Sequence, residues 1–293
     1  MQTQIYTISQ AGVRPQYIDA IQNGVAEFMA MFPEYKDDYN ICRLEQWFGN
    51  DAYCDIRQYR NTPPEIRKLY IPTNDGRYLT PFESTDWAFA VAKQSAVSQG
   101  RPHQIDANVL LKIIENNTQN KDIPQINIFV VKDDTFAVHD ANRPLTVSND
   151  KSDDFVYGLS KIDAGVVFST HRLEQMYVDD PKLLQEVIKT LTIHTMGHVF
   201  NATFNGRHNA SDRDGGGVHC DCPGCAMRSE SRANPRVLTY DHLKRQAKKI
   251  PPLCPECVAA VKSHMAERRG NSEEIEKATG FLSFISKSTQ SYS

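Results

Sequence analysis

Residues 181–200, PKLLQEVIKTLTIHTMGHVF, decide the fold that we expect for this chain. A proline suits the first turn of a helix, and the apolar residues that follow predict an amphipathic helix. His194 and His198 lie four residues apart on it, so both imidazoles project from one face about one turn apart. Two imidazoles in this arrangement can bind one zinc ion. The pair alone is a modest indication of a zinc site, because a half-buried helix can carry two such histidines without binding a metal.

Upstream of this helix, the sequence predicts a mixture of helices and strands. Helices are indicated by apolar residues at helical spacing, and strands by short runs of β-branched and aromatic residues. In chain order we expect a helix over 15–31, a helix over 103–117, a buried strand over 126–131, a long polar loop over 133–154 and a strand over 165–170.

Downstream of the helix, five of the seven cysteines crowd one part of the sequence. They are Cys220, Cys222, Cys225, Cys254 and Cys257. In a reducing compartment such a cluster indicates metal ligation rather than disulfides. The spacing alone pairs Cys222-Pro-Gly-Cys225 with Cys254-Pro-Glu-Cys257, as in the two knuckles of a zinc ribbon.

Together these residues resemble the archaemetzincin (archaelysin) family of metzincin zinc metallopeptidases. The family signature is H-E-x-x-H-x-x-G-x-x-H-C-x4-C-x-M followed by C-x2-C, and the resemblance covers roughly residues 103–262. It implies an α/β (α+β) fold: a metzincin-like zincin domain with a twisted mixed sheet and an active-site helix. A structural zinc would staple its C-terminal part. We accordingly expect a zinc peptidase domain over 101–265, an N-terminal region of unknown role over 1–100 and a flexible tail over 266–293.

The resemblance also implies roles for particular residues. A catalytic-type zinc would be bound by His194, His198 and His219, with Met227 in the turn beneath it. A second, structural zinc would be bound by Cys220, Cys225, Cys254 and Cys257, which gives two zinc ions per chain. The strand with Gly165, Val166, Val167 and Phe168 would lie along the cleft and pair with a substrate peptide.

Thr195 departs from the family pattern, which has glutamate after the first histidine. That glutamate is the general base of the peptidases, and a threonine hydroxyl cannot replace it near neutral pH. Losing this proton transfer costs about 10²–10⁴-fold in rate. The chain is therefore a slow peptidase, a peptidase whose base is Glu174, Glu186 or Glu230, or a degenerate form that binds zinc and a peptide or small protein without cleaving it.

Two ligand assignments stay open at this point. His219 lies twenty-one residues after His198, which implies an insertion of fifteen residues relative to the signature. A polar, glycine-rich insertion can form a surface loop at modest entropic cost. It contains His208, an alternative third ligand, although His219 keeps the H-C-x4-C context intact. Cys222 is likewise an alternative to Cys220 at the structural zinc.

Composition excludes other classes of protein. The chain has 33 basic and 36 acidic residues and a net charge of −3, which gives no general footprint for nucleic acid. The basic run Lys244, Arg245, Lys248 and Lys249 resembles that of nucleic-acid-binding zinc ribbons, and a solvated helix face explains it as well. No apolar run is long enough for a membrane helix and the start resembles no secretory signal, so we expect a cytoplasmic protein without a membrane partner.

Overall fold

The structure is a computed structural model that describes twelve segments of the chain. These are residues 2–10, 12–44, 53–54, 56–61, 71–72, 76–79, 85–119, 124–137, 156–204, 210–211, 218–228 and 235–270. Within them, no helix is long and apolar enough to cross a membrane.

A five-stranded sheet forms the centre of the described fold, with the strand order β2-β1-β7-β10-β9. Its strands are β1 (Thr3–Ser9), β2 (Tyr39–Leu44), β7 (Gln125–Val131), β9 (Gly158–Lys161) and β10 (Gly165–Ser169). The pairs from β2 to β10 run parallel, whereas β9 pairs antiparallel with β10 at one edge. The sheet is mixed, as the fold prediction requires.

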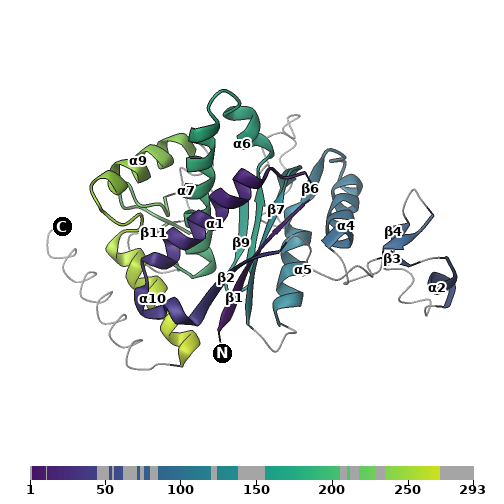
Figure 1. The fold of residues 1–293 in the computed structure, drawn as a ribbon, viewed down its shortest axis with the longest axis horizontal. Helices are drawn as coiled ribbons and strands as arrows, with labels where there is room; N and C mark the ends of the chain where they lie inside the picture. The colour runs from purple at the N-terminus through teal and green to yellow at the C-terminus, as the bar shows by residue number, and fades with distance from the viewer. Residues whose placement is uncertain are drawn as a thin grey trace.

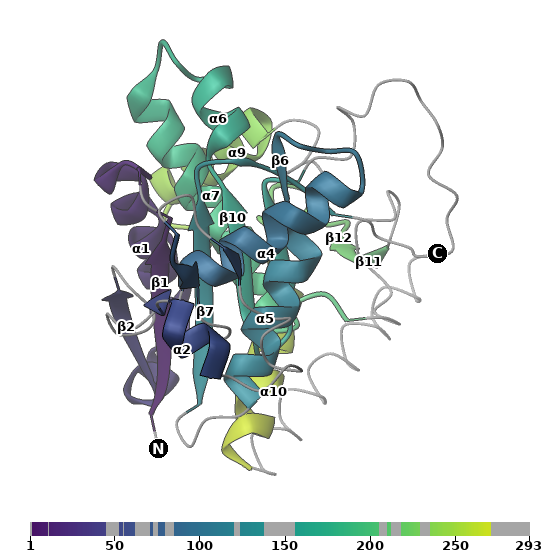
Figure 2. The ribbon, with the colours of Figure 1, turned by 90° about the vertical axis from the view of Figure 1, so that its right-hand side faces the viewer.

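Helices cover both faces of this sheet (Figures 1 and 2). α1 (Pro15–Ala30) and α7 (Pro181–Val199) lie on one face, and α4 (Thr85–Ser98) and α5 (Ala107–Gln119) on the other. The helices predicted around residues 15–31, 103–117 and 181–200 are therefore confirmed, and the mixed α/β class with them.

Residues 128–131 of β7 form an unbroken apolar run. Ile128 and Val130 are buried in the core that α1 and α7 cover, while Phe129 and Val131 are buried against α4 and α5. Because successive side chains of a strand point to opposite faces, a strand covered on both sides has apolar residues at every position. Each such side chain contributes about 1.5–3 kcal/mol to the free energy of unfolding.

The N-terminal residues belong to the same core. β1 lies between β2 and β7 in the sheet. α1 packs so closely on α7 that a Cβ atom on Gly24 would lie 2.8 Å from the carbonyl oxygen of Lys189. β1 and β2 therefore belong to the same sheet as β7, which lies beyond the boundary predicted at residue 100.

The structure describes further helices and strands. They are η1 (Pro33–Asp38), β3 (Tyr53–Cys54), α2 (Ile56–Asn61), β4 (Ile71–Pro72), β5 (Tyr78–Leu79), β6 (Gln104–Asp106), β8 (Asp134–Phe136), α6 (His171–Met176), β11 (Ala210–Ser211), β12 (His219–Cys220), α9 (Pro235–Ala247) and α10 (Pro255–Arg269). β8, which pairs with β6, lies inside the segment 133–154 that the sequence predicts to be a long loop. Most of that segment, residues 138–154, lies outside the described residues.

The C-terminal helix α10 is fastened to the N-terminal part of the chain. The Arg269 guanidinium donates to the carbonyl oxygen of Glu34 over 2.8 Å and lies 4.4 Å from the ring centroid of Tyr35. Gly270, with a φ of 68°, ends the helix in the left-handed conformation that glycine favours. Residues 266–269 are thus helical and not a tail, and residues 271–293 lie outside the described residues.

Candidate metal centres

α7 holds His194 and His198 on one face. The helix begins at Pro181 with the Asp180 side chain accepting a hydrogen bond from the backbone N–H of Leu183, 3.0 Å away. It ends before Asn201, whose φ of 56° is a left-handed conformation that asparagine tolerates. His194 is buried and His198 is half-buried.

His219 joins these two histidines from β12. The ring centroids lie 4.8 Å apart for His194 and His198, 5.2 Å for His194 and His219, and 5.0 Å for His198 and His219. One nitrogen from each ring lies within 4.8 Å of the others. His208, the alternative third ligand, lies outside the described residues.

The distance between the two helical histidines fits a tetrahedral zinc ion. The Nε2 atoms of His194 and His198 are 3.2 Å apart. Zinc–nitrogen bonds of about 2.0–2.1 Å at tetrahedral angles place two ligand atoms about 3.4 Å apart. Three neutral imidazoles that leave one coordination position open form the donor set of a catalytic zinc site.

A hydrogen bond from the turn at Ala226 determines which ring nitrogen of His194 carries the hydrogen. Its Nδ1 lies 2.7 Å from the carbonyl oxygen of Ala226. A carbonyl can only accept, so Nδ1 carries the hydrogen and Nε2 keeps the lone pair that binds a metal. The next residue, Met227, lies beneath α7, with its sulfur 2.1 Å from the position that a Cβ on Gly197 would take. Only glycine at position 197 leaves room for this methionine.

Burial keeps these imidazoles neutral. It lowers the pKa of His194 to about 3, with a further contribution from the charge of His219, while the hydrogen bond to Ala226 acts in the opposite direction. Burial and the neighbouring rings also hold the pKa of His198 well below its usual value. Neutral imidazole is the form that binds metal, so no proton has to leave these two rings at neutral pH.

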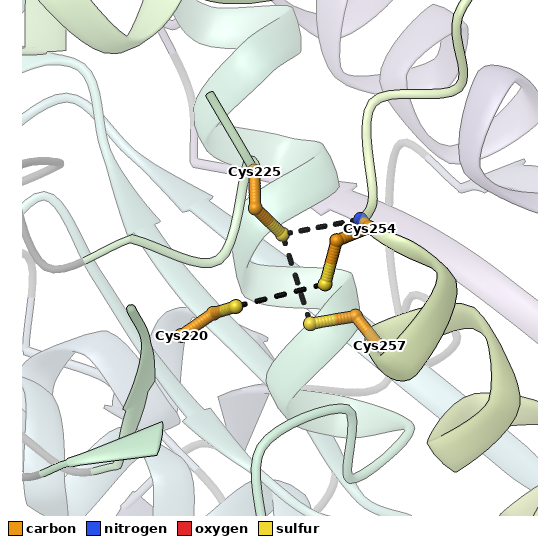
Figure 3. A group of neighbouring side chains, drawn as sticks. All are labelled: Cys220, Cys225, Cys254 and Cys257. Carbon is orange, nitrogen blue, oxygen red and sulfur yellow. Dashed lines mark hydrogen bonds between the residues drawn. The ribbon is translucent and has the colours of Figure 1, made fainter. Parts of the chain in front are cut away.

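Four buried thiols form a second group between the loop after β12 and the start of α10 (Figure 3). They belong to Cys220, Cys225, Cys254 and Cys257, and all are free thiols. The Sγ atoms are 3.7 Å apart for Cys220 and Cys254 and 3.6 Å apart for Cys225 and Cys257. Zinc–sulfur bonds of about 2.3 Å at tetrahedral angles give about 3.8 Å. This donor set fits a structural zinc ion.

Backbone N–H groups point at two of these sulfurs. The N–H of Cys222 donates to the Sγ of Cys220, and that of Cys254 donates to the Sγ of Cys225, both over 3.4 Å. Such hydrogen bonds stabilise the charge of thiolates, as the backbone around metal-bound sulfur does.

Cys222 lies beside the four-thiol group and not in it. The structure brings Cys220, rather than Cys222, together with the other three cysteines. The half-buried Cys222 groups instead with Cys254 and Glu256, its Sγ lying 4.0 Å from a Glu256 oxygen. The geometry therefore favours the ligand set implied by the family signature over the two-knuckle pairing.

Thr195 packs against the sheet. Its hydroxyl donates to the carbonyl oxygen of Thr192 over 3.0 Å, within the helix. Its methyl carbon lies 2.7 Å from the position that a Cβ on Gly158 would take. The side chain is only 6% exposed. It therefore fills the junction between α7 and β9, and its hydroxyl proton is held by the helix backbone.

The glutamates proposed as substitute bases do not join the histidines. Glu174 accepts a hydrogen bond from Thr170, and Glu186 pairs with Lys189. Glu186 also lies eight residues before His194, which is about 12 Å along a helix axis. No described carboxylate lies in the histidine group. Glu230 lies outside the described residues.

The residues predicted to pair with a peptide, Gly165–Phe168, lie in β10. β10 pairs with β7 on one side and with β9 on the other, so both of its edges are occupied. Within the described part of the chain, the free edge beside α7 belongs to β9. Gly158, the first residue of β9, is the one that contacts Thr195.

The backbone pattern shows which groups of β9 face outward. The carbonyl oxygens of Tyr157 and Lys161 accept hydrogen bonds from the side of β10, from Ser169 over 2.8 Å and from Ala164 over 3.2 Å. Backbone groups of a strand alternate between its two sides. Gly158 and Ser160 therefore face the free edge.

Comparison with known proteins gives structural neighbours only. No family model and no curated protein matches the sequence. Archaemetzincin from Methanopyrus kandleri has a TM-score of 0.45 at 14% identity, covering 90% of this chain and 96% of its own. Archaemetzincin from Archaeoglobus fulgidus, complexed with malonate, has 0.41 at 15%, covering 88% and 99%. A zinc-dependent peptidase from Methanocorpusculum labreanum has 0.40 at 15%, with the same coverage of 88% and 99%. Scores this low carry no assignment, so the function is argued from the residues.

Proposed function

We propose that this chain is a peptidase-like zinc protein that binds an extended peptide and hydrolyses it slowly or not at all. The observation that carries the proposal is the convergence of one nitrogen each from His194, His198 and His219 within 4.8 Å of one another, at the helix that packs against β9, a strand with an unpaired edge among the described residues. In this account His219 is the third ligand of a catalytic-type zinc, and the four buried thiols bind a structural one.

A zinc ion bound by the three histidines would acidify water and polarise a peptide carbonyl. The chain itself would have to move the proton from water to the leaving amine. Thr195 cannot do so, because its hydroxyl is a very weak base and already donates to Thr192. This observation favours the degenerate form over an efficient peptidase.

The peptide would pair with β9. The backbone groups of Gly158 and Ser160 face the free edge, and an extended chain can add to such an edge as one more strand. Gly158 touches Thr195, which lies between the two helical histidines, so a paired peptide would run beside the metal. Backbone pairing supports affinity for peptides of varied sequence.

A nucleic-acid role has less support. The Arg245 guanidinium donates to the carbonyl oxygens of Pro251 and Leu253, and Lys244 pairs with Asp241. Half of the basic run is therefore engaged within the protein.

Introducing the missing base tests the proposal. We expect zinc-loaded Thr195→Glu to cleave a diverse peptide library about 10²–10⁴-fold faster than the wild type, because general-base transfer contributes that much. His194→Ala, which removes a metal ligand, sets the background in both proteins. A Thr195→Glu rate equal to or below the wild-type rate, or a wild type that cleaves efficiently above background, would contradict the account of Thr195.

A further inference from the structure

One short loop serves both candidate metal centres. It begins with β12, in which His219 stacks on His194 with ring centroids 5.2 Å apart, while Cys220 places its Sγ 3.7 Å from that of Cys254. Adjacent residues of a strand point to opposite sides. The two-residue strand therefore sends one side chain to each centre.

At the other end of this loop, neighbouring residues again contact the two different centres. Ala226 lies between Cys225, a member of the four-thiol group, and Met227, which packs beneath α7. The carbonyl oxygen of Ala226 accepts a hydrogen bond from Nδ1 of His194 over 2.7 Å. The backbone N–H of Ala226 donates to the carbonyl oxygen of Pro252 over 2.9 Å. One peptide segment thus orients a histidine and is fastened to the chain that leads into α10.

A backbone hydrogen bond closes the loop on itself. The N–H of Cys220 donates to the carbonyl oxygen of Met227 over 2.8 Å. Two residues of the loop contact His194: His219 stacks on its ring, and Ala226 accepts its hydrogen bond. Each of them is next in sequence to a buried cysteine of the four-thiol group. Backbone order at these positions costs conformational entropy. A metal ion bound by Cys220 and Cys225 together with Cys254 and Cys257 would supply that order before the histidines bind anything.

We infer that the four-cysteine centre positions the three-histidine centre, so that metal at the cysteines strengthens metal binding at the histidines. The inference rests on the proposed function only in that both groups bind metal. The two sites are then thermodynamically linked, and each occupant raises the affinity for the other by the same factor. We expect that factor to be at least tenfold, with the cysteines filling first.

Cobalt titration of the metal-free full chain separates the two sites. Co²⁺ bound by thiolates gives intense charge-transfer absorption, whereas Co²⁺ bound by imidazoles gives only weak visible bands. We expect Cys254→Ser, a change at the N-cap of α10 that removes no histidine, to diminish the thiolate band and to raise the dissociation constant at the histidines at least tenfold. Cys222→Ser is the matched control and should leave both signals unchanged.

A histidine-site affinity in Cys254→Ser within twofold of the wild type would overturn the inference and leave the proposed function standing. Absence of imidazole-bound cobalt in the wild type would instead overturn the proposed function, and the inference with it. A second measurement keeps all four cysteines, so it does not depend on whether Cys254→Ser folds. In His198→Ala, one equivalent of zinc should slow amide exchange of Cys220 and Ala226 at least tenfold, and unchanged exchange would overturn the inference.

Discussion

Thr195 lies between the two helical histidines, at the position where the metallopeptidase signature has glutamate. Its surroundings explain why the substitution is tolerated. The hydroxyl bonds back to Thr192, and the methyl group fits against Gly158, where any larger residue would collide with it. Thr195 and Gly158 therefore form a matched pair that holds the edge strand on the helix, and this packing does not depend on proton transfer.

Gly197 is the other small residue on which the site depends. We expect Gly197→Ala to lower the free energy of unfolding by about 1–3 kcal/mol, because the added methyl group overlaps the Met227 sulfur. Thermal unfolding measures this change, and metal content should fall as Met227 shifts. In a Met227→Ala background the same substitution should cost much less, since the colliding atoms are gone. Equal costs in both backgrounds would show that the contact is unimportant.

At the scale of single residues, the sequence predicts the metal-binding side chains but not the contacts that position them. The spacing of His194 and His198 follows from helix geometry, and His219 follows from the H-C-x4-C motif. The carbonyl of Ala226 has no such signal, because any residue offers the same backbone oxygen. The role of Gly197 depends on a contact with Met227, thirty residues away in sequence. A glycine inside a helix is itself a sign of close approach by another segment, although it does not say which one.

At the scale of the elements, β9 and β10 show that sequence alone does not identify the edge strand of a sheet. β10 is buried throughout and carries no polar side chain before Ser169, as expected for a strand covered on both faces and paired on both edges. GLSK, the edge strand, is short and half-exposed, with little apolar signal. The apolar run therefore identifies the central strand, while the edge strand beside it is recognised only from the pairing.

The free edge of β9 can be tested with one residue. Ser160→Pro removes an N–H that faces outward, and proline is tolerated at strand edges. We expect binding of an extended peptide, measured by fluorescence anisotropy, to weaken at least tenfold without loss of metal. Ser160→Ala keeps the N–H and should bind as the wild type does. Unchanged binding by Ser160→Pro would mean that peptides do not pair with this edge.

The turn between β9 and β10 is fastened to α10 through Asp163. Its carboxylate accepts a hydrogen bond from His264 over 2.8 Å and pairs with Arg268, and its φ of 61° is left-handed. Burial alone would raise the pKa of Asp163, but the hydrogen bonds and charges of His264 and Arg268 hold it below its usual value. The folded state therefore favours the ionised carboxylate.

This gives a pH-dependent prediction. A carboxyl with a lowered native pKa stabilises the fold above its unfolded pKa of about 3.9, and the contribution disappears as the pH falls through the native value. We expect Asp163→Asn, which tolerates the same backbone conformation, to cost about 1 kcal/mol at pH 7, allowing for solvent screening of the half-exposed group. Urea unfolding at pH 7 and at about pH 3.5 measures the difference between the two proteins, which should shrink in acid. A constant difference would contradict the assignment.

At the level of the whole molecule, the N-terminal residues were the hardest to place from sequence. β1 pairs with β7 across more than one hundred residues of chain, and β2 extends the same sheet. Neither strand carries a motif, and parallel pairing through long connections leaves no local turn signal. The helix of residues 15–30 is evident from its periodicity, but its packing against α7 is visible only in three dimensions.

His219 and Cys220, which are neighbours in sequence, join the two candidate metal centres. Metal content of the purified full chain, measured before and after His219→Ala, tests this directly. We predict two zinc ions per chain in the wild type and one in the variant, because the three histidines lose a ligand while the four cysteines keep theirs. Two zinc ions in both proteins would contradict the assignment of His219 and direct attention to His208.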